Sequence, residues 1–305
     1  MNDNGSVIAK AIEWRGATMA LATVTSTWGS APRPRGSHMI VREDGRFEGS
    51  ISGGCVETDV LQRAAEVIAG RAAHMQTYGV ADGDAWEVGL PCGGEIAVLV
   101  QPVDDSGFAP RLFDRIAQEN AAGRALTLAT DLTEGVTREA ARDGDFLNRY
   151  DPPRRLLIVG AVQIAQSLAP LAQAIGVTPV VIDPRGRFLT EERFPGVELD
   201  DRWPDEAVAA RAPGEATAVV TLSHDIKIDD PALMAALRAP TGYVAALGSR
   251  RSHAARLDRL REAGFSAVDL ARIDGPAGLD IGAIGAAEIA LSITAGMIAG
   301  FNAKR

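Results

Sequence analysis

Two cysteines flanked by glycines are the residues of this chain best suited to chemistry. Cys55 ends the run Ser52-Gly53-Gly54-Cys55, and Cys92 lies in the run Pro91-Cys92-Gly93-Gly94. A helical period begins at about Cys55, so this thiol is expected near a helix start, where the helix dipole and amide donors make it ionise more readily than a free cysteine. Such a thiolate can act as a nucleophile or a metal ligand. The alternative is that each cysteine is a small buried residue in a tight turn.

Two arginines precede the run that ends in Cys55. Arg33 and Arg35 lie in a proline-rich loop and could offer planar, bidentate donors to a phosphate or a carboxylate. The alternative is a solvated turn. Glu57 and Asp59 follow Cys55 within the first helical turn, where carboxylates suit the helix dipole whatever the function, so a catalytic role for them is the weaker interpretation.

The second half of the chain carries part of a dinucleotide-binding fingerprint. Gly160 follows the strand-like run RLLIVG, and Asp183 ends the next strand, where it could contact a ribose. Val162 replaces the second glycine of the fingerprint, and its branched side chain would obstruct the approach of a pyrophosphate. A Rossmann scaffold that binds no dinucleotide is therefore the alternative. Arg185 and Arg187 could tolerate a 2′-phosphate, or could simply be solvated.

Two further strand ends in this half carry polar side chains. His224 follows the run ATAVVTL and could donate a proton or contact a phosphate, or it could only cap a loop. Ser249 can cap the next helix, and Arg250 and Arg251 lie where an anion could dock at its N-terminus, unless they are surface charges. The sequence contains no G-x-S-x-G elbow, no P-loop with lysine and no H-E-x-x-H helix.

Length and composition restrict the class of protein that carries these residues. A chain of 305 residues is long enough for two domains, and the excess of 40 acidic over 31 basic residues argues against a general nucleic-acid binder. No signal peptide or long apolar stretch indicates export or membrane insertion, so a cytoplasmic protein is expected. Two cysteines are too few for a disulfide framework.

The first half is expected to be a mixed α+β domain over residues 1–150. Alternation and helical period predict helices over 6–16, from about 56 onward and over 108–122, with strands over 18–26, 38–41, 95–103 and 124–130. The polar stretch 133–153 ends in two prolines and is expected to be a linker.

The second half, residues 151–305, alternates strands and helices regularly. We expect strands at 155–160, 179–183, 216–222 and 242–247, and helices at 161–175, 230–238 and 249–263. This rhythm predicts an α/β fold with a Rossmann-like, doubly wound parallel sheet. A last helix, 286–300, is apolar on nearly all faces, which suggests burial or a homodimer contact.

Many motifs of the chain are similar to those of the XdhC/CoxI family of xanthine and carbon monoxide dehydrogenase maturation factors. The resemblance runs from about residue 18 to 300 and rests on the following segments: ATVTSTWGSAPRPRGSHMIV, SGGCVE, PCGGEIAVLV, VIDPRGRFLTEERFP, LSHDIKIDDPAL, YVAALGSRRS and GPAGLDIGA with AAEIALSI. It implies an N-terminal family domain followed by a Rossmann domain. It also implies an accessory protein without turnover of its own, which protects molybdenum cofactor (molybdopterin), assists its sulfuration and delivers it to an apo-molybdenum hydroxylase. A cysteine desulfurase is the further partner implied.

The resemblance also assigns residues. Cys55 and Cys92 match the family's cysteines and would ligate molybdenum, a soft-ligand role, and Arg33, Arg35 and Gly36 match the loop before them. The complete set of expected cofactor-binding residues is Cys55, Cys92, Gly53, Gly54, Gly93, Gly94, Arg33, Arg35, Gly160, Asp183, His224, Ser249 and Arg250.

The chain departs from the family pattern in two places. Residues 160–163 read GAVQ where the family often has G-x-G-H, and Gly296 stands where an acidic residue is expected. Two other functions compete with the maturation factor: an NAD(P)-dependent oxidoreductase that uses the Rossmann half, and a thiol redox sensor that uses Cys55 and Cys92.

Overall fold

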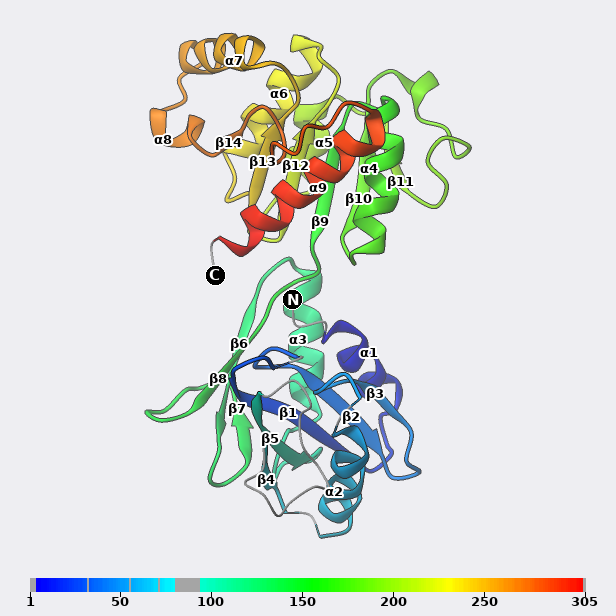
Figure 1. Ribbon diagram of the computed structural model, residues 1–305, viewed down its shortest axis with the longest axis vertical. Helices are drawn as coiled ribbons and strands as arrows, with labels where there is room; N and C mark the ends of the chain where they lie inside the picture. Colours follow the sequence, from blue (N-terminus) through cyan, green and yellow to red (C-terminus); the bar gives the residue numbers. More distant parts are fainter. Residues whose placement is uncertain (1–3, 32, 55, 71, 80–93, 304–305) are drawn as a thin grey trace. The chain divides into compact units, whose positions relative to one another are not determined.

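The chain divides into two compact units, Met1–Pro152 (unit 1) and Pro153–Arg305 (unit 2). The structure is a computed structural model that describes residues 4–31, 33–54, 56–70, 72–79 and 94–303 (Figure 1). Each unit has its own pair of apolar clusters.

Unit 1 is built on a five-stranded antiparallel sheet with the order β3-β2-β1-β5-β4. Its strands are β1 (Met19–Trp28), β2 (His38–Arg42), β3 (Phe47–Gly49), β4 (His74–Tyr78) and β5 (Glu95–Pro102). Because neighbours are antiparallel, the ends of β1, β3 and β4 and the beginnings of β2 and β5 meet at one end of the sheet.

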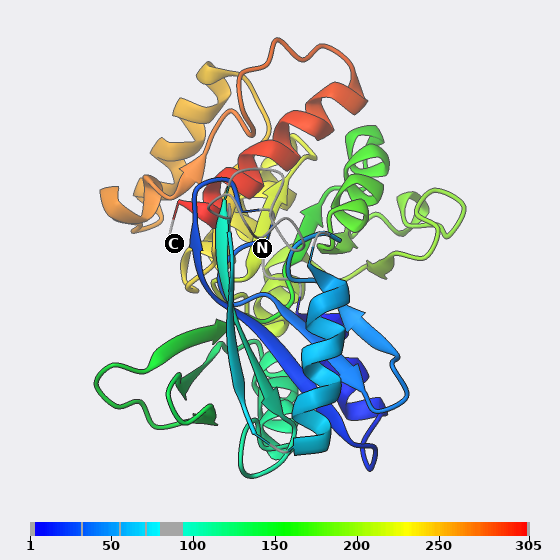
Figure 2. The same ribbon diagram turned by 60° about the horizontal axis from the view of Figure 1, so that its bottom comes forward.

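Helices cover both faces of this sheet. The helix α2 (Glu57–Gly70) lies over one face of the sheet (Figure 2). It buries a stripe of Val60, Ala64 and Val67 there, as its helical period predicts. The other face packs against α1 (Gly5–Glu13) and α3 (Arg111–Ala121).

The expectation that residues 133–153 form a linker is wrong, because two strands of unit 1 lie in this segment. Unit 1 has a second sheet, of three antiparallel strands in the order β7-β6-β8: β6 (Leu126–Asp131), β7 (Val136–Arg138) and β8 (Phe146–Tyr150). In β8 every second residue is buried, namely Phe146, Asn148 and Tyr150. The polar composition of the segment hid this period of two, because the middle inward position is an asparagine.

Unit 2 has the predicted doubly wound α/β fold, a six-stranded sheet in which all neighbours are parallel. The order β11-β10-β9-β12-β13-β14 reverses direction between β9 and β12, which are the two central strands. The strands are β9 (Arg155–Val159), β10 (Thr178–Ile182), β11 (Glu198–Asp200), β12 (Thr217–Thr221), β13 (Tyr243–Ala246) and β14 (Ile273–Asp274). Ligands of such folds bind at the carboxyl ends of the strands where the order reverses.

Helices lie on both faces of the unit 2 sheet. On one face α9 (Ala286–Asn302) packs beside α4 (Gln163–Ala174) (Figure 1). The other helices of this unit are α5 (Pro204–Ala210), α6 (Ile226–Leu237), α7 (Arg250–Glu262), α8 (Ala267–Leu270) and the 3₁₀ turn η1 (Gly186–Phe188). The helix α6 starts four residues before the expected 230, because the Asp225 side chain caps it by accepting from Lys227 N (2.9 Å). No helix within the described ranges is long and apolar enough to cross a membrane.

Candidate functional site

The described candidate residues of unit 1 gather at one end of its five-stranded sheet. Arg33 and Arg35 lie between β1 and β2, Gly53 and Gly54 lie between β3 and α2, and Gly94 directly precedes β5. Cys55, Cys92 and Gly93 lie outside the described residues. The sheet topology therefore brings Gly53, Gly54, Gly94 and the arginine loop to the same end of the sheet.

The loop before α2 is organised by the carboxylate of Glu57. This carboxylate accepts hydrogen bonds from Ser50 Oγ (2.8 Å), Ile51 N (3.3 Å), Ser52 N (2.9 Å), Gly54 N (2.9 Å) and Ser52 Oγ. Burial alone would raise the pKa of Glu57, but these bonds outweigh burial and lower it to about 2.

Glu57 is the residue of this loop whose role sequence reasoning missed. The available signal was a glutamate three residues after Gly54, the spacing at which a side chain reaches back to a preceding backbone N–H. Gly53 and Gly54 have φ of 77° and 118°, a region that glycine adopts without strain. Glu57 accepts hydrogen bonds from the backbone N–H groups of Ile51, Ser52 and Gly54. These three N–H groups are therefore already bonded within the protein.

The two arginines are held differently. Arg33 donates from Nε to Ser50 O (3.3 Å), which joins the arginine loop to the Glu57 loop, and among described residues its two Nη groups have no hydrogen-bond partner. Arg35 donates from Nε to Thr25 O (3.1 Å), and its guanidinium lies 4.4 Å from the centre of the Phe146 ring. That carbonyl belongs to a β-bulge, where β1 has one extra residue between Val24 and Ser26 against β5.

A buried polar network lies beneath the arginine loop and centres on His38. His38 Nε2 contacts Tyr150 Oη (2.8 Å) and Asn148 Nδ2 (3.2 Å), and Nδ1 contacts Thr23 Oγ1 (2.9 Å). Burial lowers the pKa of His38 to about 4, so the ring is neutral at pH 7. Since the Asn148 amide donates, Nε2 is the acceptor and Nδ1 carries the proton.

This network also holds the arginine loop in place. Gly36 O accepts from Asn4 Nδ2 (2.8 Å) and from Asn148 Nδ2 (3.4 Å). Gly49, at the end of β3, lies so close to His38 that a Cβ there would be 2.4 Å from His38 O. The sequence offered no signal for the pairing of His38 with Tyr150, which is 112 positions away.

The candidate residues of unit 2 gather at the carboxyl edge of its parallel sheet. Gly160 follows β9 with φ of 104°, and a Cβ there would be 2.8 Å from Ser223 N, so the loops after β9 and β12 touch. Asp183 follows β10, and Ser249 follows β13. The expectation that strand ends bring these residues to one edge is confirmed by the topology, whereas their role in binding stays a prediction.

Asp183 is fully buried, and groups of the protein itself donate hydrogen bonds to both oxygens of its carboxylate. Oδ1 accepts from Arg185 N (2.9 Å) and Nε (2.9 Å), and Oδ2 accepts from Ala161 N (2.8 Å) and Arg185 Nη2 (2.7 Å). Burial would raise the pKa of Asp183, but these hydrogen bonds hold it below its ordinary value. Val162, the residue in place of the second fingerprint glycine, is the N-cap position of α4.

His224 is exposed and has a φ of 60°, which is unusual for a residue other than glycine. Its backbone N–H donates to Oδ2 of the buried Asp229 (3.1 Å), and Ser223 Oγ donates to Oδ1 (2.6 Å). Burial raises the pKa of Asp229, although Arg256 lies 3.9 Å away. Asp229, inside α6, is thus the residue that holds the His224 loop, and sequence reasoning missed it.

Ser249 has the expected capping role. Its side chain accepts from Ser252 N (3.1 Å) at the start of α7, and Arg250 is exposed in the first turn. Gly296, where an acidic residue was expected, lies against Gly278: a Cβ at position 296 would be 2.9 Å from Gly278 Cα and 3.0 Å from Tyr243 Oη. Close packing of α9 on the loop after β14 therefore accounts for glycine at this position.

Within the part of the chain that the structure describes, no three His, Cys, Asp or Glu side chains form a group that could hold a metal ion. The described end of unit 1 instead offers guanidinium groups beside a loop that is hydrogen-bonded to the Glu57 carboxylate. This arrangement can bind an anion. The two titratable groups that organise it, Glu57 and His38, both have a pKa well below neutrality.

Two family models match the chain. The XdhC Rossmann domain matches residues 156–297, and the XdhC and CoxI family matches residues 14–79. These ranges lie in unit 2 and unit 1, respectively.

Relatives and a solved structure match the chain over almost its entire length. It is 32% identical to the molybdenum cofactor insertion chaperone PaoD of Escherichia coli over 96% of this chain and 87% of PaoD. It is 26% identical to a protein of Bacillus subtilis described as a probable subunit of xanthine dehydrogenase, over 91% of this chain and 92% of that protein. A crystal structure described as a xanthine dehydrogenase from Bacillus halodurans superposes with a TM-score of 0.76 at 25% identity, covering 98% of this chain and 97% of that chain. From these matches and the shared two-unit fold, we conclude that the chain belongs to the XdhC and CoxI family.

Proposed function

We propose that this protein is a maturation factor that binds molybdenum cofactor in unit 1 and delivers it to an apo-molybdenum hydroxylase. The observation that carries the proposal is the match to PaoD, because it extends over both units at 32% identity. The similarity to a probable xanthine dehydrogenase component of Bacillus subtilis supports a hydroxylase of that class as the target.

The residues at the loop end of unit 1 fit such a ligand. The cofactor carries a phosphate and a molybdenum centre held by sulfur, so a site for it needs cations and soft donors. Arg33 supplies a guanidinium whose Nη groups have no partner among described residues, and Ser50 O fixes its orientation. Cys55 and Cys92 would supply the thiolates. Bound there, the cofactor would bring the metal centre on which the target enzyme's redox chemistry depends.

The protonation states of the neighbouring groups favour holding over turnover. Glu57, with a pKa of about 2, is an anion at any physiological pH, and His38, with a pKa of about 4, is neutral and buried. Both side chains are engaged in fixing loops. A general acid or base works best with a pKa near the working pH, and neither group has one.

The proposal is tested by cofactor retention. The full chain is purified from cells that make molybdopterin, and bound molybdenum is measured by mass spectrometry and bound pterin by the fluorescence of its oxidised form. We expect both to copurify with the wild type, Cys55→Ser to abolish retention and Cys92→Ser to reduce it. We expect Arg33→Ala to weaken pterin binding at least tenfold, as the loss of one charge-assisted phosphate contact implies, and so to lower the pterin that copurifies.

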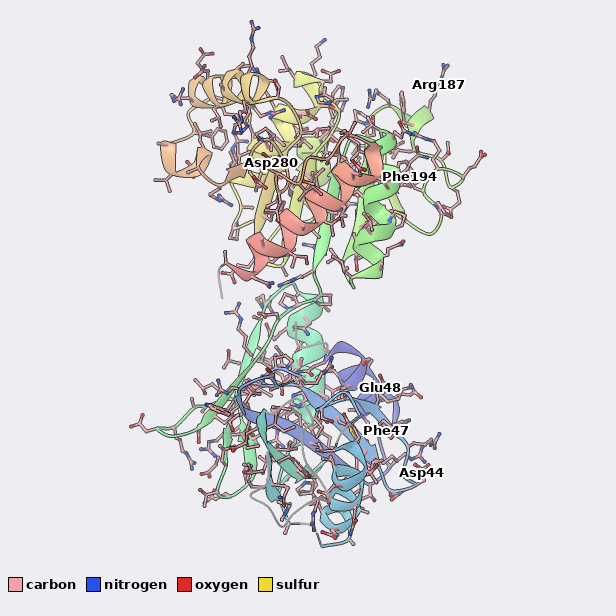
Figure 3. The ribbon with its side chains drawn as sticks, in the orientation of Figure 1. Asp44, Phe47, Glu48, Arg187, Phe194 and Asp280 are labelled. Carbon is pink, nitrogen blue, oxygen red and sulfur yellow. The ribbon has the colours of Figure 1, made fainter. Side chains whose placement is uncertain are left out.

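Arg46→Ala is the matched control. Arg46 lies in the turn between β2 and β3, where it pairs with Asp44 (2.8 Å), and Asp44 is exposed at that turn (Figure 3). This variant should retain the cofactor fully. Absence of molybdenum and pterin from the wild type, or full retention by Cys55→Ser, would contradict the proposal.

Delivery and partners need separate measurements. Incubation of the loaded protein with an apo-molybdenum hydroxylase should restore that enzyme's activity, whereas the emptied protein should not. A cysteine desulfurase as donor of the sulfido ligand is tested by copurification from the same cells. Self-association, suggested by the apolar last helix, is tested by analytical ultracentrifugation.

A further inference from the structure

We propose that Arg185 is a specificity-determining residue of unit 2: by saturating Asp183 it closes the ribose position of the Rossmann fold, so that unit 2 rejects NAD(H). This inference goes beyond the proposed function and does not depend on it. It concerns the one site of the fold at which a dinucleotide would be expected.

In Rossmann folds an acidic residue at the end of the second strand accepts hydrogen bonds from the ribose hydroxyls. Asp183 occupies that position, directly after β10. An ionised carboxylate offers about four acceptor positions. All of them are used here, by Ala161 N and by the N, Nε and Nη2 groups of Arg185.

The guanidinium of Arg185 is held in this position from two sides. Its Nε and Nη2 make a bidentate pair with the carboxylate, at 2.9 Å and 2.7 Å. The guanidinium also lies over the Phe188 ring, 4.5 Å from the ring centre. Bonding to Asp183 also raises the pKa of Arg185, so the pair stays charged.

A ribose diol would have to displace this pair to reach the carboxylate. Asp183 has no exposed surface, so the hydroxyls could reach it only if the Arg185 side chain moved away. The displaced guanidinium would then lose its charge-assisted hydrogen bonds, and NAD(H) has no group at the ribose 2′ position that would replace the carboxylate.

A second barrier lies at the pyrophosphate position. Val162 precedes α4, where a glycine would let the backbone approach the pyrophosphate. Arg193 further stabilises the turn between β9 and α4, because its Nη2 donates to Ala161 O (2.8 Å). Rejection of NAD(H) therefore has two components, of which Arg185 is the one that acts on the ribose.

The experiment titrates NADH into the full-length protein and follows nicotinamide fluorescence and binding heat. We expect no saturation of the wild type up to roughly 1 mM, a limit that corresponds to very weak binding. Starting from Val162→Gly, which relieves the pyrophosphate position, addition of Arg185→Met should tighten NADH binding at least tenfold. Methionine keeps apolar contact with Phe188 but frees the two carboxylate acceptor positions that the guanidinium occupies, while the backbone N–H groups of Ala161 and residue 185 keep the other two.

Arg187 supplies the matched control. It is exposed, no hydrogen bond or ion pair joins it to other described residues, and it projects outward from the loop after β10, whereas Phe194 of the same segment lies against the core (Figure 3). Val162→Gly with Arg187→Met should therefore bind NADH no better than Val162→Gly alone. Circular dichroism and thermal unfolding establish that each variant is folded, and Arg185→Ala replaces Arg185→Met if the latter is not.

Two outcomes would overturn the proposal. One is saturable binding of NADH by the wild type in the micromolar range, which needs no variant to fold. The other is a folded Val162→Gly, Arg185→Met protein that binds NADH no more tightly than Val162→Gly. Addition of Asp183→Asn to the double variant should remove the gain, because the gain is expected to come from the freed carboxylate.

Discussion

Replacement of Glu57 by glutamine is expected to destabilise unit 1 in a pH-dependent way. Glutamine has nearly the same volume, but its amide nitrogen would face N–H donors that now bind a carboxylate oxygen. A pKa of about 2 against the ordinary 4.5 corresponds to at most about 3 kcal/mol of stability at neutral pH. Solvent screening of this partly exposed group reduces the expected loss to about 1–2 kcal/mol.

The pH dependence follows from the direction of the pKa change. Because the folded pKa lies below the unfolded one, Glu57 contributes its full stability above about pH 5, and the contribution disappears as the pH falls through 4.5 toward 2. By pH 4 the difference between wild type and Glu57→Gln should have shrunk by about 0.8 kcal/mol.

Urea unfolding followed by tryptophan emission measures the stability difference between wild type and Glu57→Gln in unit 1, the unit that contains Glu57. Trp14 is buried in unit 1, with 9% of its surface exposed, whereas Trp203 in unit 2 is 53% exposed, so a large change in emission reports mainly on unit 1. Glu43→Gln, at an exposed position, is the control and should change nothing. Equal stability of Glu57→Gln and wild type at pH 7, or a difference that stays constant between pH 7 and pH 4, would refute the role assigned to the Glu57 carboxylate.

Four further substitutions test the packing around both sites. Tyr150→Phe removes the hydroxyl that donates to His38, so urea unfolding should show a loss of about 1–2 kcal/mol. Gly49→Ala places a Cβ 2.4 Å from His38 O at a φ of 92°, and should cost more than about 3 kcal/mol, whereas Gly54→Ala, with nothing within 4 Å, should cost only about 1–2 kcal/mol of backbone strain. Gly296→Ala should lower the thermal midpoint of unit 2 by an amount equivalent to about 1–3 kcal/mol, because its Cβ would lie 2.9 Å from Gly278 Cα; an unchanged midpoint would contradict the close approach.

The regular elements could be predicted because each carries its own local pattern. The buried strands β9 and β12 are apolar runs, and α2 shows a clear stripe, so periodicity was sufficient for the α/β fold of unit 2 and for the strands β1, β2 and β5 of unit 1, but not for the short strands β3 and β4. Strand ends also located Gly160 and Asp183 at the right edge, since the carboxyl ends of parallel strands coincide.

The partners of the site residues could not be predicted in the same way. His38 meets Tyr150 across 112 positions, and the polar Asn148 that serves this contact concealed the strand β8. Asp183 lies at the strand end where a ribose contact was predicted. No sequence pattern indicated that its carboxylate binds Arg185, two positions later, because the turn after β10 folds the guanidinium back. Sequence patterns predict the position of a residue in a strand or helix. The folded structure decides which group its side chain contacts.

The bulge in β1 has a consequence for how this chain can vary by insertion and deletion. Loss of residue 25 would restore an uninterrupted ladder between β1 and β5, which by itself would favour the sheet. The same loss would remove the carbonyl that receives Arg35 and shift the following loop by one position. A shortened β1 would therefore leave Arg35 Nε without the carbonyl that it binds here, so the length of β1 and the place of this arginine depend on each other.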